Sequence, residues 1–480
     1  MLGPFLAGAL ALGSLVSMTG GAGAATAAPA GPAALVAGPV TTGTLIEPTS
    51  LTPVDLGAHG YVEQEFFVSG TASAYRLTSP ETSSGRWTVE PTTRAFYRTR
   101  VVVRRPADPA DFNGTVIVEW TNVTALESSP DWSYLANTLV SRGYAYVALS
   151  AQSLAVNGGS PLLPAEAGTY EGLKRSEPAR YASLVHPGDQ YAFDILSQVG
   201  RAVRHGAPGS VPMLGPLVAK RVVADGESQS AIFLTTYVDA LAPSARAFDA
   251  YLIHSRGGGA EPLSGASLAS GHRLEDVRIR TDLHVPVFVF ETETDVGPLL
   301  DYGPARQPDT RWFRAWEVAG TAHADATIVG NYAPSIGCDF TVNQGPQSYV
   351  LSAALVALQR WMTTGTPPPV AQPLQLVKGR AEVARDSLGL ALGGVRTPAV
   401  DVPVAVLSGD APAGVSTLCS LFGHTVPFTD AQLTALYGSP TAYVARYKEA
   451  LTKAVAGGFL LSADAPALLA QAEAVTFPTS

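Results

Sequence analysis

The most informative stretch of this chain is the run Lys220-Arg221-Val222-Val223-Ala224-Asp225-Gly226-Glu227-Ser228-Gln229-Ser230-Ala231-Ile232. An apolar strand ends at Gly226, a serine follows two residues later, and small or apolar residues then begin a helix. A sharp strand-to-helix turn of this kind lifts a serine hydroxyl above the edge of a sheet, and crowding at the turn requires small neighbours. The run therefore predicts Ser228 as a nucleophile, and a helix N-cap is the alternative role for this serine.

The match to the G-x-S-x-G pattern is incomplete, because Ser230 stands at the position of its last glycine. Serine is small enough to fit there. Two further G-x-S triplets, Gly265-Ala266-Ser267 and Gly414-Val415-Ser416, do not follow a buried strand. The preceding strand is what distinguishes Ser228 from the serines of these triplets.

Nearly continuous apolar runs predict strands that are buried on both faces. These runs are 115–120, 145–149, 221–224 and 285–290. Segments of helical period lie among and after them, at 134–140, 190–199 and 353–362. The alternation predicts an open α/β sheet, mostly parallel, with helices on both faces. Earlier runs at 61–68 and 97–103 partly alternate in polarity and predict antiparallel strands at the start of the sheet.

An acid and a histidine follow Ser228 in the order that a catalytic triad on such a sheet requires. Asp295 comes after the run 285–290, and His323 lies just past another predicted strand. All three side chains are then expected at strand ends. Glu293, two residues before Asp295, is the alternative acid.

The chain resembles the α/β-hydrolase superfamily, and within it secreted bacterial alpha/beta hydrolase domain proteins. The likeness extends over nearly the whole mature chain and implies an α/β-hydrolase fold. It also implies Ser228 as nucleophile, His323 as general base and Asp295 as the orienting acid. The runs that carry it include Glu119-Trp120-Thr121-Asn122-Val123, Gly226-Glu227-Ser228-Gln229-Ser230, Phe290-Glu291-Thr292-Glu293-Thr294-Asp295 and Ala319-Gly320-Thr321-Ala322-His323.

A hydrolase of this fold needs two backbone N–H groups directed at the oxyanion. One is expected from Gln229, directly after the nucleophile. The other is expected from the turn after Trp120, around Asn122 and Val123, although the usual His-Gly-Gly form is absent there.

The first 46 residues contain no charged side chain and no histidine. An apolar stretch from Phe5 to Val16 and a possible cleavage site at Ala25-Thr26-Ala27 predict a secretory signal peptide over residues 1–27, although no basic residue precedes the apolar stretch. An uncleaved anchor or a flexible tail is the alternative. The signal predicts a secreted, extracellular protein.

The rest of the chain is expected to form a disordered leader over 28–40 and a single domain over 41–480. Within this domain, the Pro-rich segment at 365–409 predicts an insertion with short strands. Residues 410–480 predict a helical extension, which either covers the sheet or forms part of a cap.

Charge and composition argue against several partners. The 40 acidic and 31 basic residues give a net charge of −9, and Lys and Arg form no dense cluster, so nucleic acid is not expected. After the signal, no segment has the ~20 consecutive apolar residues of a membrane helix. No group of His, Cys and carboxylates has metal-binding spacing, so neither a metal nor a cofactor is expected. The oligomeric state is open.

Cys338 and Cys419 are the two cysteines of the chain. In an exported protein an even count favours one disulfide, and two buried thiols are the alternative.

These observations favour a secreted serine hydrolase that cleaves the ester bond of a small molecule through an acyl-enzyme intermediate. An acyltransferase or an amidase would use the same triad. A catalytically inert binding protein with the same fold is a further alternative, motivated by Ser230 and by the atypical oxyanion turn.

Overall fold

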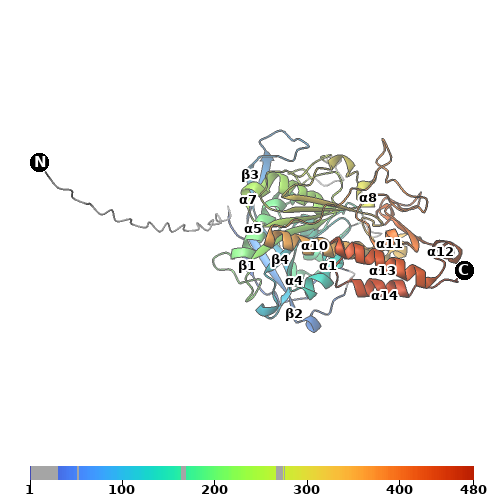
Figure 1. The fold of residues 1–480 in the computed structure, drawn as a ribbon. Helices are drawn as coiled ribbons and strands as arrows, with labels where there is room; N and C mark the ends of the chain where they lie inside the picture. The colour runs from blue at the N-terminus through green and yellow to red at the C-terminus, as the bar shows by residue number, and fades with distance from the viewer. Residues whose placement is uncertain (2–30, 51–52, 164–168, 266–273, 275, 480) are drawn as a thin grey trace.

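The structure is a computed structural model that describes Met1 and residues 31–50, 53–163, 169–265, 274 and 276–479. Except for Met1, the predicted signal peptide, residues 1–27, lies outside the described residues. From residue 31 onward, the described chain forms a central sheet with helices packed on both of its faces (Figure 1).

A nine-stranded sheet runs through the described chain in the order β1-β2-β3-β5-β4-β6-β7-β8-β9. The first three pairings in this order are antiparallel, and the following five are parallel. The parallel strands therefore present their carboxyl ends at one edge, where ligands bind in sheets of this kind. The strands are β1 (Leu35–Ala37), β2 (Tyr61–Leu77), β3 (Val89–Pro106), β4 (Thr115–Trp120), β5 (Ala145–Leu149), β6 (Arg221–Glu227), β7 (Ala250–His254), β8 (Val287–Thr292) and β9 (Phe313–Val318).

Helices connect and cover these strands. No helix among the described residues is long and apolar enough to cross a bilayer. The helices are α1 (Pro130–Ser141), α2 (Ser153–Asn157), α3 (Gly172–Ser176), α4 (Pro178–Tyr181), α5 (Ala192–His205), α6 (Gln229–Thr236), α7 (Ala242–Ala245), α8 (Glu293–Val296), α9 (Ala326–Val329), α10 (Gln347–Thr364), α11 (Pro398–Asp401), α12 (Asp430–Tyr437), α13 (Pro440–Ala456) and α14 (Ala465–Glu473).

Each central strand supplies side chains to two separate cores. On β4, Val116 and Val118 join the core that also contains side chains of α5 and α6, whereas Ile117 joins the core that contains side chains of α1 and α10. Successive side chains of a strand point to opposite faces, so a strand buried on both faces is apolar at almost every position. This two-sided burial explains the continuous apolar runs of the sequence.

The predicted strands are confirmed with small changes of boundary. The structure places β4 and β5 at the predicted residues, and it extends β6 to Glu227. The strand predicted at 285–290 begins two residues later as β8, after Pro286, which has no N–H to donate to a sheet. Strand β7, which lies between β6 and β8, has no counterpart among the strands predicted from the sequence.

The prediction of a disordered leader over residues 28–40 is wrong for the described part of that segment. Leu35–Ala37 pairs with β2 at the edge of the sheet, with Val36 opposite Val68. Val36 is 4% exposed. A composition rich in Ala, Pro and Gly is typical of disorder, but a three-residue edge strand needs only a partner strand and one buried side chain.

The predicted insertion and the helical extension both pack against the β9 side of the sheet. Val395, in the insertion, donates its N–H to Glu317 O of β9 at 2.7 Å. Phe459, in the extension, lies with its ring centroid 4.9 Å from that of Trp316. Helices α12, α13 and α14 add side chains to the core shared with α1 and α10. The extension therefore covers a face of the sheet. A short separate sheet pairs β10 (Ala405–Ser408) with β11 (His424–Pro427).

Cys338 and Cys419 form a disulfide, with Cα atoms 5.6 Å apart. Both are buried in a small apolar cluster that includes Phe422. Two residues after Cys419, Leu421 O accepts the N–H of Ala324 at 3.1 Å. The disulfide therefore anchors the segment that contacts the chain next to His323.

Removal of this disulfide by the Cys338→Ser, Cys419→Ser double variant is expected to lower the free energy of unfolding by about 4 kcal/mol, since the bond closes a long loop in the unfolded chain. The two cysteines are 81 residues apart in sequence. Urea unfolding of the wild type, with and without reductant, and of the variant measures the change. Equal denaturation midpoints for all samples would contradict the prediction.

Candidate active site

Ser228 lies at the junction of β6 and α6 in a strained backbone conformation, with φ 58° and ψ −122°. A non-glycine residue with positive φ costs roughly 1–3 kcal/mol and persists only where the surroundings enforce it. Here the N–H of Ser228 donates to His254 O of β7 at 2.9 Å, and Ser230 Oγ donates to Glu227 O at 2.8 Å. Ser230 thus fits at the position of the missing glycine by donating a hydrogen bond to the turn.

The hydroxyl of Ser228 faces the imidazole of His323. Ser228 Oγ is 2.7 Å from His323 Nε2, and its side chain makes no cap hydrogen bond to α6. On the other side of the ring, His323 Nδ1 is 2.6 Å from Asp295 Oδ1. Ser228 is partly exposed, whereas His323 is 4% exposed and Asp295 is fully buried. The structure therefore brings the three predicted residues together in the expected order.

The carboxylate of Asp295 is held by several donors besides the imidazole. Its Oδ2 accepts the N–H of Thr292 at 2.6 Å, the hydroxyl of Thr292 at 2.7 Å and the hydroxyl of Ser255 at 2.7 Å. Burial alone would raise the pKa of Asp295, but His323 and the two hydrogen bonds from Thr292 outweigh it and lower the pKa below its ordinary value. Asp295 is therefore a stable carboxylate partner for the imidazole.

Sequence reasoning missed Ser255 and Thr292. Ser255 directly follows β7 and has φ 56°, so a second strained serine lies next to His254, whose carbonyl group accepts the N–H of Ser228. A polar residue at the carboxyl end of a buried strand was the available signal, but it depended on recognising β7.

Glu293, the alternative acid, is directed elsewhere. Its Oε1 accepts the N–H of Gly320 at 2.5 Å, and its Oε2 accepts the N–H of Gly409 at 2.9 Å. Arg385 Nη2 is 2.9 Å from the same Oε2. Burial raises the pKa of Glu293, and Arg385 and the two amides offset part of the rise. Glu293 therefore links Gly320, in the loop before His323, to Gly409. The imidazole of His323 contacts Asp295 instead.

The candidate oxyanion donors differ in availability. Gln229 begins α6, and the first N–H groups of a helix have no acceptor within it. The N–H of Asn122 donates to Ser128 O at 2.9 Å, which contradicts a role for this amide in the oxyanion hole. The N–H of Val123 makes only a long contact of 3.4 Å to Gln229 Oε1. Gln229 and Val123 are the backbone donors that fit the predicted role.

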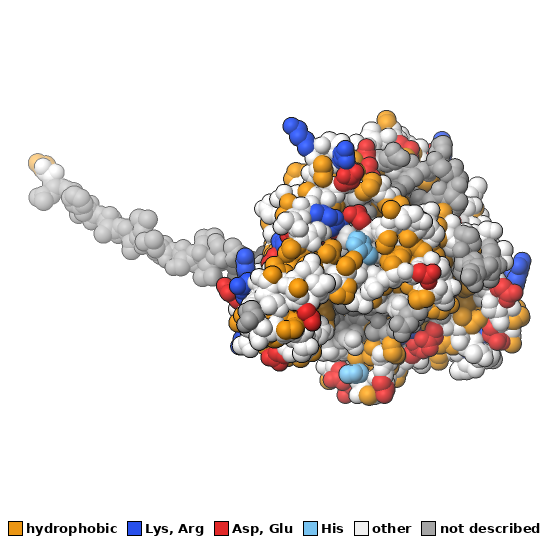
Figure 2. All heavy atoms as spheres, turned by 90° about the vertical axis from the view of Figure 1, so that its right-hand side faces the viewer, with side chains coloured by type: hydrophobic (Ala, Val, Ile, Leu, Met, Phe, Trp, Pro, Cys, Tyr) orange, Lys and Arg blue, Asp and Glu red, His pale blue; other side chains and the backbone are white. Residues whose placement is uncertain are grey.

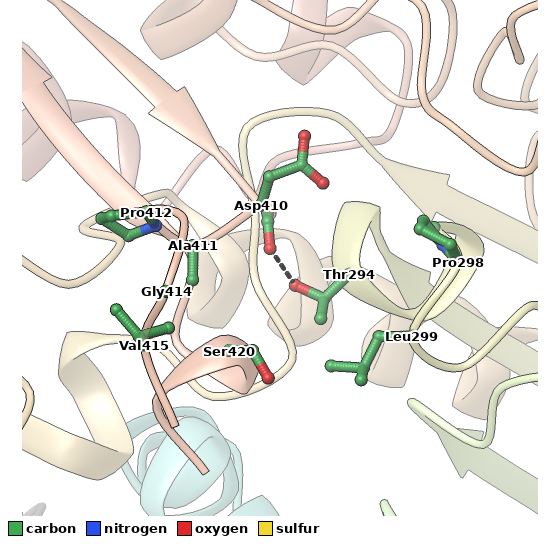
Figure 3. A pocket seen from close by; sticks show the side chains of 11 residues that line it. Thr294, Pro298, Leu299, Asp410, Ala411, Pro412, Gly414, Val415 and Ser420 are labelled. Carbon is green, nitrogen blue, oxygen red and sulfur yellow. Dashed lines mark hydrogen bonds between the residues drawn. The ribbon is translucent and has the colours of Figure 1, made fainter. Parts of the chain in front are cut away.

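A cavity of about 250 Å³ lies between Thr294 of α8, the residues after α8 and the segment 409–420 (Figure 3). Thr294 lines it and also contacts His323, since Thr294 Oγ1 donates to Gly409 O at 2.6 Å and accepts the N–H of His323 at 3.1 Å. Apolar residues form much of the remaining wall, namely Pro298, Leu299, Ala411, Pro412 and Val415.

The described residues contain no group of three or more His, Cys, Asp and Glu side chains that could hold a metal ion. Two buried acids of this region, Glu119 and Asp131, contact backbone amides and a histidine. Glu119 accepts the N–H groups of Asp131 at 3.1 Å and Trp132 at 3.0 Å, where α1 begins. Asp131 Oδ1 is 2.6 Å from His254 Nδ1.

Comparison with solved structures finds serine hydrolases and esterases at low similarity. An a/b serine hydrolase without lid from Xanthomonas campestris is 11% identical, with 51% of this chain and 83% of that chain covered and a TM-score of 0.25. A fungal esterase from Rhizomucor miehei is 10% identical, with 62% and 86% covered and a TM-score of 0.31. The siderophore hydrolase EstA from Aspergillus nidulans is 13% identical, with 55% and 77% covered and a TM-score of 0.25.

Comparison with curated proteins finds no match. A family model described as an alpha/beta hydrolase domain, in contrast, matches residues 36–470. That range includes all nine strands except the first residue of β1, as well as the turn that holds Ser228. The chain therefore belongs to the alpha/beta hydrolase family.

Proposed function

We propose that this protein is a secreted serine hydrolase that cleaves carboxylic ester bonds of small molecules. The observation that carries the proposal is the pair of contacts made by one imidazole, 2.7 Å to Ser228 Oγ and 2.6 Å to Asp295 Oδ1. A serine hydroxyl is a weak nucleophile at neutral pH and becomes effective when an oriented base removes its proton.

The proposed reaction has two stages. Ser228 Oγ attacks the acyl carbon while its proton passes to His323 Nε2, and Nε2 then gives that proton to the leaving alkoxide. Water attacks the resulting acyl-enzyme in the same way and releases the acid. Asp295 holds the imidazole with Nδ1 protonated and stabilises the imidazolium that forms. The N–H groups of Gln229 and Val123 are proposed to bind the oxyanion.

Charge and redox chemistry support the proposed partner and location. The net charge is −9, and on the face shown in Figure 2 the Lys and Arg side chains are scattered among acidic and apolar ones. This distribution suits a small neutral ester better than a polyanion. The Cys338–Cys419 disulfide supports an oxidising compartment, where such bonds persist.

The direct test is labelling of the purified mature protein with a fluorophosphonate probe, followed by intact mass and peptide mapping. One adduct at Ser228 is expected, because the probe reacts with serines that a base has activated. Turnover of an ester panel, with an added alcohol or amine as a competing acceptor, then distinguishes hydrolysis from acyl transfer. A folded protein that takes no label would contradict the proposal.

Activity is expected to fall as the pH is lowered from 8 to 5, because protonated His323 cannot accept the proton of Ser228. Asp295 does not cause this decline. Folding lowers the pKa of Asp295, so its carboxylate stabilises the folded protein at every pH above the ordinary pKa of about 3.9. This contribution to the free energy of unfolding is lost only below that pH. Initial rates across this range, with far-UV circular dichroism as a folding control, measure the effect. A rate that is constant from pH 8 to 5 would exclude His323 as the base.

A further inference from the structure

Glu227, the residue before the nucleophile, also faces the catalytic imidazole. Its Oε1 is 3.7 Å from His323 Nε2, the nitrogen that contacts Ser228 Oγ. Glu227 is the last residue of β6 and is 2% exposed. The imidazole therefore lies between two carboxyl groups, with Asp295 on the Nδ1 side and Glu227 on the Nε2 side.

The side chain of Asn122 holds this second carboxyl group in place. Asn122 Nδ2 contacts Glu227 Oε2 at 3.3 Å and donates to the main-chain oxygen of Glu227 at 3.1 Å. Asn122 belongs to the turn after β4 that also contains Val123. Glu227 thus contacts the turn proposed to supply an oxyanion donor, and it contacts the proposed base.

The groups around Glu227 are almost all acids. Glu119 of β4, Asp131 of α1 and Asp295 of α8 act on it electrostatically, and so does the phenol of Tyr134 in α1. His254 of β7 is bound to Asp131. Burial and these three carboxylates raise the pKa of Glu227 well above its ordinary value. His323 is the group in contact with Glu227 that can carry a positive charge.

We propose that Glu227 is a positioning residue whose carboxyl group is coupled by charge to the His323 imidazole across the Oε1–Nε2 contact, so that it stabilises the imidazolium that forms when Nε2 takes the proton of Ser228. The proposal rests on the proposed function, because His323 must be the base. Glu227 forms no bond to substrate. The proton of Ser228 still passes to Nε2 and then to the leaving group, and Glu227 acts by charge on that nitrogen and through Asn122 on the adjacent turn.

The test is the Glu227→Gln variant, whose amide oxygen can still accept from Asn122 but cannot become charged. The acidic limb of the profile of kcat/KM against pH is expected to move to lower pH by at most about one unit, because the carboxylate form of Glu227 favours the protonated imidazole and the raised pKa of Glu227 limits the share of that form. The Glu227→Ala variant is expected to show the same move and also a lower plateau, since Asn122 then loses its side-chain acceptor and keeps only the main-chain oxygen of residue 227.

Glu293→Gln is the matched control. It also neutralises a buried glutamate near the His323 loop, but Glu293 contacts Gly320, Gly409 and Arg385. Its acidic limb is expected to stay at the wild-type position. If the acidic limb of the Glu227→Gln profile coincides with that of the wild type, the proposal is overturned and Glu227 has a purely structural role.

A second readout separates this proposal from the proposed function. Nitrogen-15 NMR of labelled histidines follows the protonation of the His323 ring without substrate, with the signal assigned by a His323→Asn sample. A midpoint that moves to lower pH in Glu227→Gln supports the coupling even if no ester is cleaved. An unchanged midpoint contradicts it even if Ser228 takes the fluorophosphonate label.

Discussion

Alanine in place of Ser228 is expected to lower kcat for ester hydrolysis by on the order of 10⁶-fold, the scale seen when the nucleophile of a serine hydrolase is removed. The variant loses the only atom to which the acyl group can bond at this site, although the proposed oxyanion donors remain. Stopped or continuous ester assays at saturating substrate measure the loss, and the fluorophosphonate adduct should disappear with it. The substitution also removes a hydroxyl that caps no helix, so folding should be preserved.

The matched control is Ser416→Ala. Ser416 belongs to another G-x-S triplet and is exposed, and its hydroxyl accepts the N–H of Cys419 at 3.2 Å. This variant should keep both turnover and the label at Ser228. If instead Ser228→Ala folded normally and retained its esterase activity, the nucleophile assignment would be wrong.

Asparagine in place of Asp295 is expected to lower kcat by about 10⁴-fold, because an amide can orient the imidazole in the wrong tautomer and cannot stabilise the imidazolium. The change conserves shape, and the acceptor oxygen can still take hydrogen bonds from Thr292 and Ser255. Steady-state kinetics should therefore show a large fall in kcat and a smaller change in KM.

Glu293→Gln again serves as the comparison for this prediction, since Glu293 was the alternative acid. Its carboxylate ties together Gly320 and Gly409, so the variant is expected to lose thermal stability more than catalytic rate. A greater loss of kcat in Glu293→Gln than in Asp295→Asn would reverse the assignment of the acid.

Local sequence patterns were sufficient to predict much of the sheet and the strand-to-helix turn at Ser228. The strands β4 and β5 have apolar side chains at almost every position because both faces of the sheet are covered, and such runs are recognisable without any knowledge of their partners. The turn at Ser228 is also a local feature, since a strand must end, a strained residue must follow and a helix must begin within a few residues.

Other elements depend on partners that are distant in sequence. β1 is a short strand in an Ala/Pro/Gly-rich segment, and only pairing with β2 makes it part of the sheet. β7 was missed as a strand, yet its last residue supplies the carbonyl group that holds the amide of Ser228, and Ser255, which directly follows it, holds Asp295.

The order of Ser228, Asp295 and His323 and their positions after strands could be determined from the sequence by itself, because strand periodicity and chain order are local and linear properties. The choice between Asp295 and Glu293 could not, since the two are separated by a single residue and differ in the direction of their side chains. The contact between Glu227 and His323 could not be determined from the sequence either, because the two residues are 96 positions apart. Tertiary structure decides such contacts, because the packing of α8 and of the loop after β9 determines which oxygen atoms reach the imidazole.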